Sequence, residues 1–302
     1  MKLFSYYIER QMKHDDRIVN WKNHIVTETL SYSYRDTVYD QQTYPSKLHY
    51  HDYYEVVVLE EGDIQYICEG RIYQPQYGDA IVIPPGKFHM SVIHGESTRY
   101  KRHVFYLYPS AFDPIGHGAL TSFLDRMKGA DILTLGSLEY RQGLMDALGG
   151  LKKVFANEPS PLECAMGLSR VIDVFYLFNQ KDCQRKSDVV FLPDSILKLQ
   201  QYIDGNFAQI SSVSQVAEHF FYSREYISRL FRKYFDTTIS EYIVKRRIAR
   251  SQTLIMQGIP LIEVAYQVGF GSLSTFIRAF RSVVGIPPSE YRKCKKEPSG
   301  SQ

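Results

Sequence analysis

The sequence has few cysteines and no long apolar segment. Its four cysteines are scattered along the chain, and none belongs to a Cys-x-x-Cys pair. This pattern indicates a reducing compartment and argues against a disulfide framework or a zinc-thiolate site. No stretch approaches the ~18–20 apolar residues of a membrane span, and no early apolar run resembles a signal peptide. We therefore expect a cytoplasmic protein that has no membrane partner.

A strong excess of charge of one sign is also absent, because the net charge of the 302 residues is only +3. The charge is nevertheless unevenly divided. Residues 194–302 hold 15 Lys and Arg against nine Asp and Glu, whereas residues 1–193 hold 21 against 24. The length allows two domains. A basic C-terminal part beside a slightly acidic N-terminal part is typical of a DNA-reading domain joined to a domain with another role.

One pattern in the C-terminal part occurs twice. Residues 216–223 recur as residues 264–271, and the segment after each copy recurs 49 residues later. Each copy predicts a short helix that carries a small residue, Ala217 or Ala265, then a tight turn and a second helix. Because internal repetition fixes architecture, we expect two helix-turn-helix motifs in tandem.

The turns and the second helices carry further signals. Gly269 suits a positive φ in the second turn, where the first copy has Phe221, and Ser223 is a candidate N-cap. The apolar spacing predicts which residues of each second helix face the core. They are Tyr226, Ile227, Leu230, Phe231 and Tyr234 in the first copy, and Phe276, Ala279, Phe280 and Val283 in the second.

The opposite faces of these helices carry arginines and small polar residues, which predicts contacts to double-stranded DNA. The predicted contacts are Arg224, Glu225, Ser228, Arg229 and Arg232, then Leu273, Ser274, Ile277, Arg278 and Arg281, together with Arg247 of the helix between the motifs. Arginine can donate two hydrogen bonds to guanine O6 and N7, a carboxylate can accept one from cytosine N4, and apolar side chains can contact thymine methyl groups.

Four segments of this region, residues 227–233, 263–265, 268–270 and 285–292, resemble the AraC/XylS family of bacterial transcription regulators. The resemblance extends over roughly residues 193–292. It implies two motifs joined by one long helix, both reading the same face of a duplex, and RNA polymerase as a partner if the protein is an activator. One departure is Arg246, where members of the family usually have an apolar residue.

The N-terminal part has strand-like patterns in place of the helical repeat. Short β-branched runs between residues 25 and 108, punctuated by Gly and Pro, predict a small β-barrel or jelly roll. Within it, His49-x-His51-x3-Glu55-x6-Gly62 and a second segment that ends at His89 resemble the two cupin motifs. In cupins the residues that match His49, His51, Glu55 and His89 bind one divalent transition metal. The second interpretation is that these four residues line an effector pocket or pair with one another.

After residue 109 the apolar residues recur with the spacing of an α-helix, and two amphipathic helices are expected at residues 138–157 and 161–180. The resemblance implies that they pack on the barrel and form a homodimer. We expect a multidomain α+β protein with a cupin-like β-barrel and flanking helices, followed by an all-α domain with two helix-turn-helix motifs. The expected divisions are 1–180 for the effector-binding and dimerisation domain, 181–192 for the linker, 193–293 for the DNA-binding domain and 294–302 for a flexible tail.

The sequence thus predicts a sequence-specific transcription regulator that is controlled by a small-molecule effector. The resemblance implies a sugar or a related carbon source as this effector. We expect no catalytic residues and no required cofactor. The alternative is a metal-binding cupin, either a metal sensor or an enzyme, that carries a DNA-binding domain. Regulation without any ligand is a third possibility.

Overall fold

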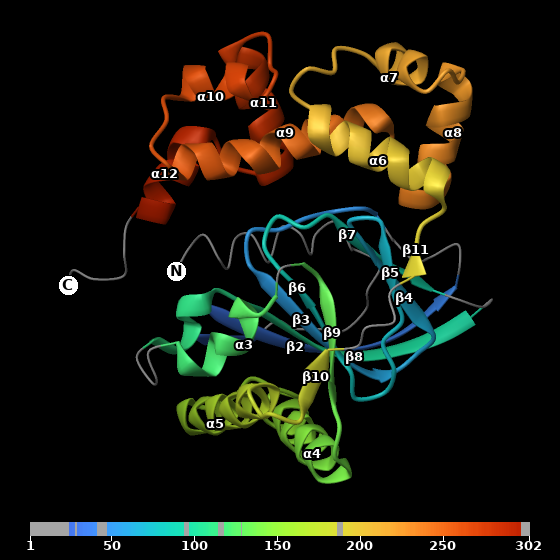
Figure 1. Cartoon of the computed structure of the whole chain (residues 1–302). Helices are drawn as coiled ribbons and strands as arrows, with labels where there is room; N and C mark the ends of the chain where they lie inside the picture. Colours follow the sequence, from blue (N-terminus) through green and yellow to red (C-terminus); the bar gives the residue numbers. More distant parts are fainter. Residues whose placement is uncertain are drawn as a thin grey trace. The chain divides into compact units, whose positions relative to one another are not determined.

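A computed structural model describes residues 24–27, 29–40, 47–93, 97–113, 118–127, 129–185 and 190–296. The chain divides into two units between Val190 and Phe191. The first unit contains two β-sheets with flanking helices, and the second is built from helices α6 to α12 (Figure 1). This confirms the predicted combination of a β-sheet domain and an all-helical domain. No helix in the described ranges is both long enough and apolar enough to cross a membrane.

The N-terminal unit contains two sheets, and the pairings within the larger sheet and between β4 and its neighbours β5 and β7 are antiparallel. The larger has the strand order β1-β2-β8-β3-β6-β9-β10, and the smaller has the order β11-β5-β4-β7. The strands are β1 (His24–Thr27), β2 (Leu30–Asp40), β3 (Tyr54–Glu61), β4 (Ile64–Cys68), β5 (Arg71–Tyr73), β6 (Ala80–Ile83), β7 (His89–Ile93), β8 (Ser97–Leu107), β9 (Asp131–Leu135), β10 (Cys183–Arg185) and β11 (Val190–Phe191). Short helical segments lie at η1 (Pro109–Phe112), η2 (Ala119–Thr121) and α3 (Ser122–Asp125).

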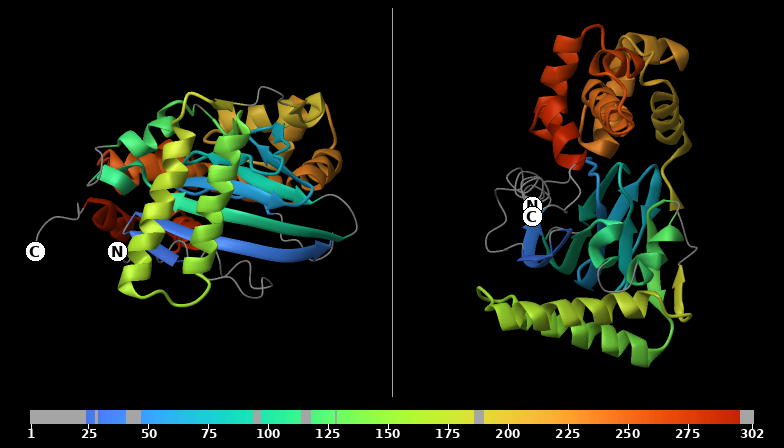
Figure 2. Two further views of the ribbon diagram at one scale, coloured as in Figure 1. Left: turned by 90° about the horizontal axis from the view of Figure 1, so that it is seen from below. Right: turned by 90° about the vertical axis from the view of Figure 1, so that its left-hand side faces the viewer.

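One face of the larger sheet is covered by helices α4 (Leu138–Val154) and α5 (Pro161–Phe178), which lie side by side in Figures 1 and 2. Successive side chains of a strand point to opposite faces. Leu30 and Tyr32 of β2 therefore join the core beneath the helices, where the rings of Phe105 and Phe175 also meet. A capping box at Ser160 and a proline at the first helical position define the start of α5.

The other face of the larger sheet looks toward the smaller sheet. The hydroxyl of Tyr66 on β4 lies 2.5 Å from that of Tyr100 on β8. His89 Nε2 on β7 lies 3.1 Å from a carboxylate oxygen of Glu55 on β3. Side chains from both sheets thus meet in a polar interior, which is the barrel that the sequence predicts.

Residues 181–192 are expected to be a linker, but the first half of this stretch contains a strand. Residues 183–185 form β10, which pairs antiparallel with β9. Cys183 is buried, and the guanidinium of Arg185 forms an ion pair with Asp131. A strand this short has too few residues for alternation to reveal it, so its polar sequence resembled a loop.

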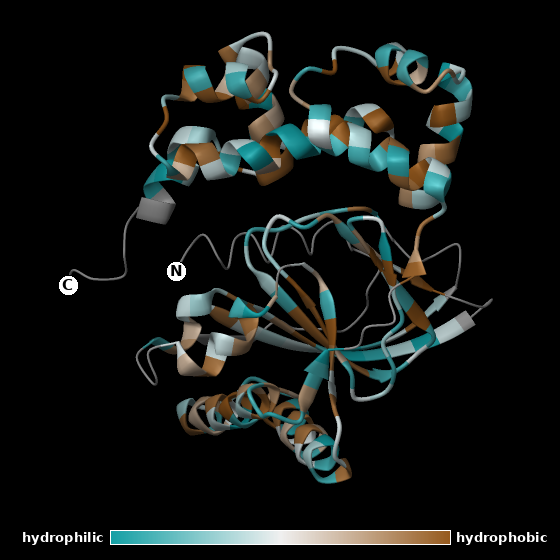
Figure 3. Ribbon diagram, in the orientation of Figure 1, coloured by the Kyte–Doolittle hydropathy of each residue, from teal (hydrophilic) through white to brown (hydrophobic). Residues whose placement is uncertain are grey.

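The C-terminal unit contains seven helices in its described part. They are α6 (Asp194–Asn206), α7 (Val213–His219), α8 (Arg224–Phe235), α9 (Ile239–Met256), α10 (Leu261–Gln267), α11 (Leu273–Val284) and α12 (Pro288–Lys296). The bounds of α10 follow those of α7 by 48 residues, and the bounds of α11 follow those of α8 by 49. This confirms the tandem repeat, and in Figure 3 brown and teal residues alternate along these amphipathic helices.

Two boundaries in this unit differ from the expected ones. The sequence predicts the helix between the two motifs at residues 241–256, whereas α9 starts two residues earlier because Thr238 and Glu241 form a capping box. Helix α12 continues to Lys296, so the segment expected to be a tail begins within a helix. Residues 297–302 lie outside the described part of the chain.

Candidate functional site

The turn between the two helices of each motif has a left-handed residue. Gly269 has φ +88°, as its position in the sequence predicts, and Phe221 has φ +56° at the matching place. A Cβ atom on Gly269 would lie 2.1 Å from the carbonyl oxygen of Ala208. The second turn therefore requires glycine for two reasons, whereas the first accommodates a phenylalanine whose side chain is 96% exposed.

Serine caps place the start of each second helix. The Ser223 hydroxyl accepts a hydrogen bond from the backbone N–H of Tyr226 at 3.1 Å, which confirms the predicted N-cap. Ser272 accepts one from Thr275 N–H at 3.2 Å in the second motif. Each cap satisfies a backbone donor that the helix leaves unpaired, so α8 and α11 begin at equivalent residues.

The buried face of α8 is shifted from the predicted one. Ile227, Phe231 and Phe235 are buried, whereas the prediction that Tyr226 is buried was wrong because 38% of its surface is exposed. Its ring packs beside that of Tyr222, with centroids 4.9 Å apart. The apolar side chains that face the core recur at intervals of four residues, and Tyr226 lies at the edge of that stripe.

Helix α11 differs from the prediction in a way that concerns its DNA-facing residues. Phe276, Phe280 and Val284 are its buried side chains. Leu273 and Ile277, which were expected to face DNA, are half-buried and pack against the core of the second motif. Only part of each side chain is therefore available for contact with a thymine methyl group.

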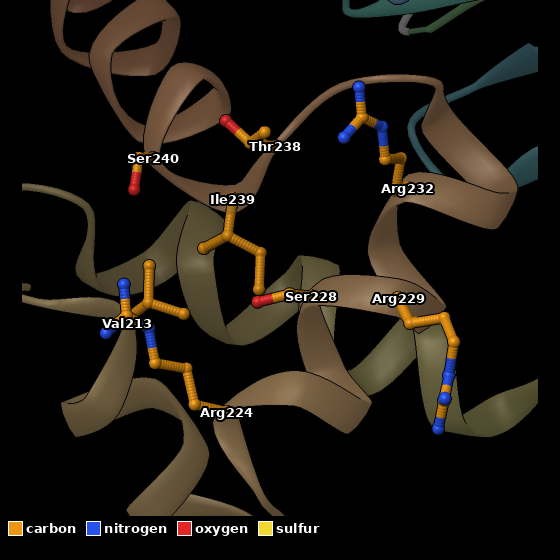
Figure 4. Close-up of a pocket in the computed structure, with 8 residues that line it drawn as sticks. All are labelled: Val213, Arg224, Ser228, Arg229, Arg232, Thr238, Ile239 and Ser240. Atoms are coloured by element: carbon orange, nitrogen blue, oxygen red, sulfur yellow. The ribbon is translucent and has the colours of Figure 1, made fainter.

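The predicted arginines are nearly all exposed. Arg224, Arg229 and Arg232 project from α8, and Arg278 and Arg281 project from α11. Glu225 and Ser274 are exposed as well, and Ser228 is half-buried. Arg224, Ser228, Arg229 and Arg232 line a cleft of about 470 Å³ with Val213 and the first residues of α9 (Figure 4). This cleft is a cationic surface suited to phosphate groups.

Arg247 occupies a different position from the other predicted contacts. Its guanidinium donates hydrogen bonds to the backbone carbonyls of Phe207 at 2.9 Å and Ile210 at 2.7 Å. Burial lowers its pKa below the usual arginine value. The side chain thus holds the segment after α6 against α9, and its hydrogen-bond donors are directed into the unit.

Arg246, where the family pattern has an apolar residue, also has an internal role. It forms an ion pair with Asp204 of α6, and the hydroxyl of Tyr242 donates to the same carboxylate at 2.7 Å. Gln200 donates to the Tyr242 hydroxyl at 3.2 Å. A polar network thus connects α6 to α9 where an apolar contact was expected.

The structure brings together the four residues of the cupin-like motif. One carboxylate oxygen of Glu55 lies 3.3 Å from His51 Nε2 and 3.1 Å from His89 Nε2. A ring nitrogen of His49, a carboxylate oxygen of Glu55 and a ring nitrogen of His89 all lie within 4.8 Å of one another. His51 and His89 are buried, whereas His49 is exposed. Burial opposes ionisation of Glu55, but the hydrogen bonds from His51 and His89 outweigh it and hold the pKa of Glu55 well below its ordinary value.

The three imidazoles share a second feature. The Nδ1 atoms of His49, His51 and His89 lie 3.0, 2.7 and 2.9 Å from backbone carbonyl oxygens. A carbonyl only accepts, so each Nδ1 carries the proton and a neutral ring presents a lone pair at Nε2. Ligating histidines commonly donate their other ring N–H to a carbonyl in this way. The four side chains therefore fit a divalent transition metal, and the hydrogen bonds of His51 and His89 to Glu55 equally fit a cluster whose members pair with one another.

Sequence reasoning missed two charged residues of the barrel interior. Arg35 on β2 and Arg102 on β8 are buried, and Arg35 donates to the Tyr106 hydroxyl at 2.8 Å. The ring of Tyr106 lies 6.5 Å from that of His51. The signal was the alternation of β2, which places Arg35 on the same face as Ser31 and Ser33.

Comparison with known proteins connects both units to one family. A family model described as an AraC-like ligand binding domain matches residues 33–163, and a helix-turn-helix domain model matches residues 216–294. Together these two matches cover more than half of the chain.

Individual relatives agree with the family models. The HTH-type transcriptional activator AarP of Providencia stuartii is 29% identical over 116 residues, which are 38% of this chain and 82% of AarP. The uncharacterized HTH-type transcriptional regulator YfiF of Bacillus subtilis is 22% identical over 84% of this chain and 81% of its own length. The regulator GbdR of Pseudomonas aeruginosa is 31% identical over 42% of this chain, which spans only 36% of GbdR. The chain belongs to the AraC family of transcription regulators.

Proposed function

We propose that this protein is a DNA-binding transcription regulator whose N-terminal unit binds a small-molecule effector. The observation that carries the proposal is the repetition of one motif with exposed arginines on its second helix. Arg229 and Arg278 occupy equivalent places in α8 and α11, 49 residues apart. A recognition helix fits the major groove, and motifs ~34 Å apart would enter successive grooves.

The predicted contacts divide into two groups. Arg224, Arg229 and Arg232 border the cleft, and Arg278 and Arg281 supply the corresponding charge in the second motif. Arg229 and Arg278 are our candidates for guanine recognition, and Glu225 can accept from cytosine N4. Leu273 and Ile277 can contact DNA only through the exposed portions of their side chains. Arg247 supports the unit from inside, through its hydrogen bonds to backbone carbonyls.

The role of the arginine-lined cleft in DNA binding can be tested with full-length protein and a labelled duplex of arbitrary sequence. The variant Arg224→Ala/Arg229→Ala/Arg232→Ala should bind more weakly. The slope of log affinity against log salt should fall by about one for each arginine that no longer neutralises a phosphate. Arg170→Ala is the matched control, because it removes an exposed arginine from the N-terminal unit. Equal weakening of binding in the variant and the control would contradict the proposal.

The effector site belongs to the barrel interior. A sugar or related carbon source is the class that the family resemblance implies, and the tyrosines and charged groups between the two sheets suit a polar ligand. We propose that the effector changes how the DNA-binding unit is presented, and that an activator of this type also contacts RNA polymerase. No enzymatic role is part of this proposal, because the relatives are named as transcriptional regulators.

A second candidate, in which the barrel holds a metal, is favoured by two observations. His51 Nε2 and His89 Nε2 both approach one carboxylate oxygen of Glu55, and a ring nitrogen of His49 lies within 4.8 Å of ligand atoms of Glu55 and His89. His49, His51, Glu55 and His89 would hold it, and the ion would supply positive charge to a site that already holds an ionised carboxylate. Elemental analysis of the purified protein tests this directly. A stoichiometric transition metal that is lost in His49→Ala/His51→Ala but kept in His219→Ala would support a metal sensor. An absence of metal from the wild-type protein would leave the four residues to the effector site.

A further inference from the structure

Three exposed aromatic side chains lie at the turn of the first motif and at the start of α8. The exposed fraction is 96% for Phe221, 46% for Tyr222 and 38% for Tyr226. The ring centroids of Tyr222 and Tyr226 are 4.9 Å apart. These three residues together form the aromatic patch of the first motif. Apolar side chains that gather on a protein surface are typical of a site where another molecule binds.

The turn does not require these exposed rings, because the second motif forms the same turn without them. In the first turn the backbone N–H groups of Phe221 and Tyr222 donate to carbonyls of α7 at 3.1 and 3.0 Å. In the second turn those of Gly269 and Phe270 donate to carbonyls of α10 at 3.0 and 2.9 Å. Phe270 is buried and glycine has no side chain, so the second turn keeps its aromatic ring inside the core. The hydrogen bonds of the turn therefore do not explain why the rings of the first turn are exposed.

Phe221 also has an unfavourable backbone conformation. Its φ of +56° lies in the left-handed region, which favours glycine and is costly for a residue with a Cβ atom. Its ring lies in solvent and recovers little of that cost through packing. Strained residues of this kind cluster at functional sites. A phenylalanine at this position is therefore better explained by contact with a second molecule than by the stability of the fold.

The aromatic patch is continuous with the surface proposed to bind DNA. Arg224, the first residue of α8, follows Phe221 by three residues and lines the cleft with Arg229 and Arg232 (Figure 4). All five charged side chains of α8 are exposed, and four of them are basic. This charge favours an anionic partner. Because the N-terminal residues of a recognition helix contact base edges, the patch lies at the end of α8 that would enter the groove.

We propose that Phe221 makes an apolar contact with double-stranded DNA beside the segment that α8 reads, and that Tyr222 and Tyr226 extend this contact. Thymine carries a methyl group in the major groove that a phenylalanine ring can contact, and each deoxyribose presents carbon atoms. The inference rests on the proposed function, because it adds a contact to the same DNA-binding surface. It also makes the two motifs unequal, since the second has Gly269 at the equivalent position.

Binding of the full-length protein to a duplex that the wild type selects from a random pool tests this proposal. An apolar contact neutralises no phosphate, so its loss lowers affinity without changing the salt dependence. Phe221→Ala and Phe221→Gly should each weaken binding about fivefold or more. The slope of log affinity against log salt should keep its wild-type value in both variants, whereas removal of the cleft arginines lowers that slope.

The choice of variants separates the ring from the backbone. Alanine keeps the left-handed strain and glycine relieves it, so weaker binding in both identifies the ring as the cause. Phe221→Tyr keeps a ring and should bind as the wild type does. Thermal unfolding should show Phe221→Gly melting at or above the wild-type midpoint, so its weaker binding cannot come from a loss of folding. Tyr77→Gly is the matched control, because it removes an exposed aromatic side chain from a turn of the N-terminal unit, and it should leave DNA affinity unchanged.

Replacement of thymine by uracil in the segment read by α8 separates the two apolar groups of the DNA. If the ring contacts a methyl group, one uracil weakens binding of the wild type and leaves Phe221→Ala unaffected. If the ring contacts deoxyribose, the loss caused by Phe221→Ala is the same with uracil as with thymine.

The remaining outcomes count against the proposal. Wild-type affinity in both Phe221→Ala and Phe221→Gly, weaker binding in Phe221→Gly alone, or a lowered salt slope in either variant would overturn it. If these variants bind normally while the cleft arginine variant binds weakly, the proposed function stands and only this inference fails. A wild-type protein that selects no duplex would contradict the proposed function, and this inference with it.

Discussion

At the scale of single residues, the two turns place different side chains in the same left-handed backbone conformation. This conformation costs a residue with a Cβ atom roughly 1–2 kcal/mol. Phe221 recovers none of that cost through packing, because its ring projects into solvent. Gly269 avoids the cost, and it also avoids a clash with the carbonyl oxygen of Ala208.

Opposite substitutions at these two positions should therefore have opposite effects. Phe221→Gly should leave the unfolding free energy unchanged or raise it by up to ~1 kcal/mol, since relief of backbone strain outweighs the flexibility of glycine. Gly269→Ala should lower it by ~2 kcal/mol or more, because backbone must move to admit the Cβ atom. Urea unfolding of the full-length protein measures both. Equal small effects at the two positions would contradict the described turn geometry.

At the scale of elements, helix α5 presents an apolar stripe to solvent. Leu162, Met166 and Tyr176 are all exposed, and their spacing places them on one face of the helix. The opposite face of α5 packs on the larger sheet through Val171, Phe175 and other buried residues. An exposed stripe of this kind is typical of a helix that meets a second protein surface. We propose that the second surface is the same helix of another copy.

Charge placed in the stripe should weaken a homodimer. Leu162→Glu/Met166→Glu is expected to raise the dimer dissociation constant at least tenfold, which corresponds to about 1.4 kcal/mol. Sedimentation velocity of the full-length protein over a range of concentrations measures this constant. Lys153→Glu on the exposed face of α4 is the control and should leave it unchanged. A wild-type protein that is monomeric throughout would rule out this role for α5.

At the scale of the whole molecule, the sequence predicted the architecture well where patterns are local. The repeat fixed α7, α8, α10 and α11, because helix caps and the spacing of apolar residues are set by near neighbours. The cupin-like motif predicted that His49, His51, Glu55 and His89 lie close together, because three of them share one short segment and the family pattern supplied the fourth.

Features that depend on distant partners were not predictable. The opposition of Arg35 to Arg102 follows from the register of β2 with β8, which no local signal specifies. The internal roles of Arg246 and Arg247 depend on Asp204 and on carbonyls about 40 residues away. Charged side chains were read as surface residues because most charged residues are exposed. Buried polar groups are the places where that reasoning fails.

We propose that the two equivalent helices α8 and α11 read two separate parts of one DNA site. The most direct measurement is selection of binding sequences from a random duplex pool with the full-length wild-type protein. We predict an enriched site of two short segments, with centres about 10–10.5 base pairs apart. Selection with Arg229→Ala should lose preference at one segment, and selection with Arg278→Ala at the other, each costing ~1–3 kcal/mol. An enriched site with a single segment, or the same positions relaxed by both variants, would contradict the claim.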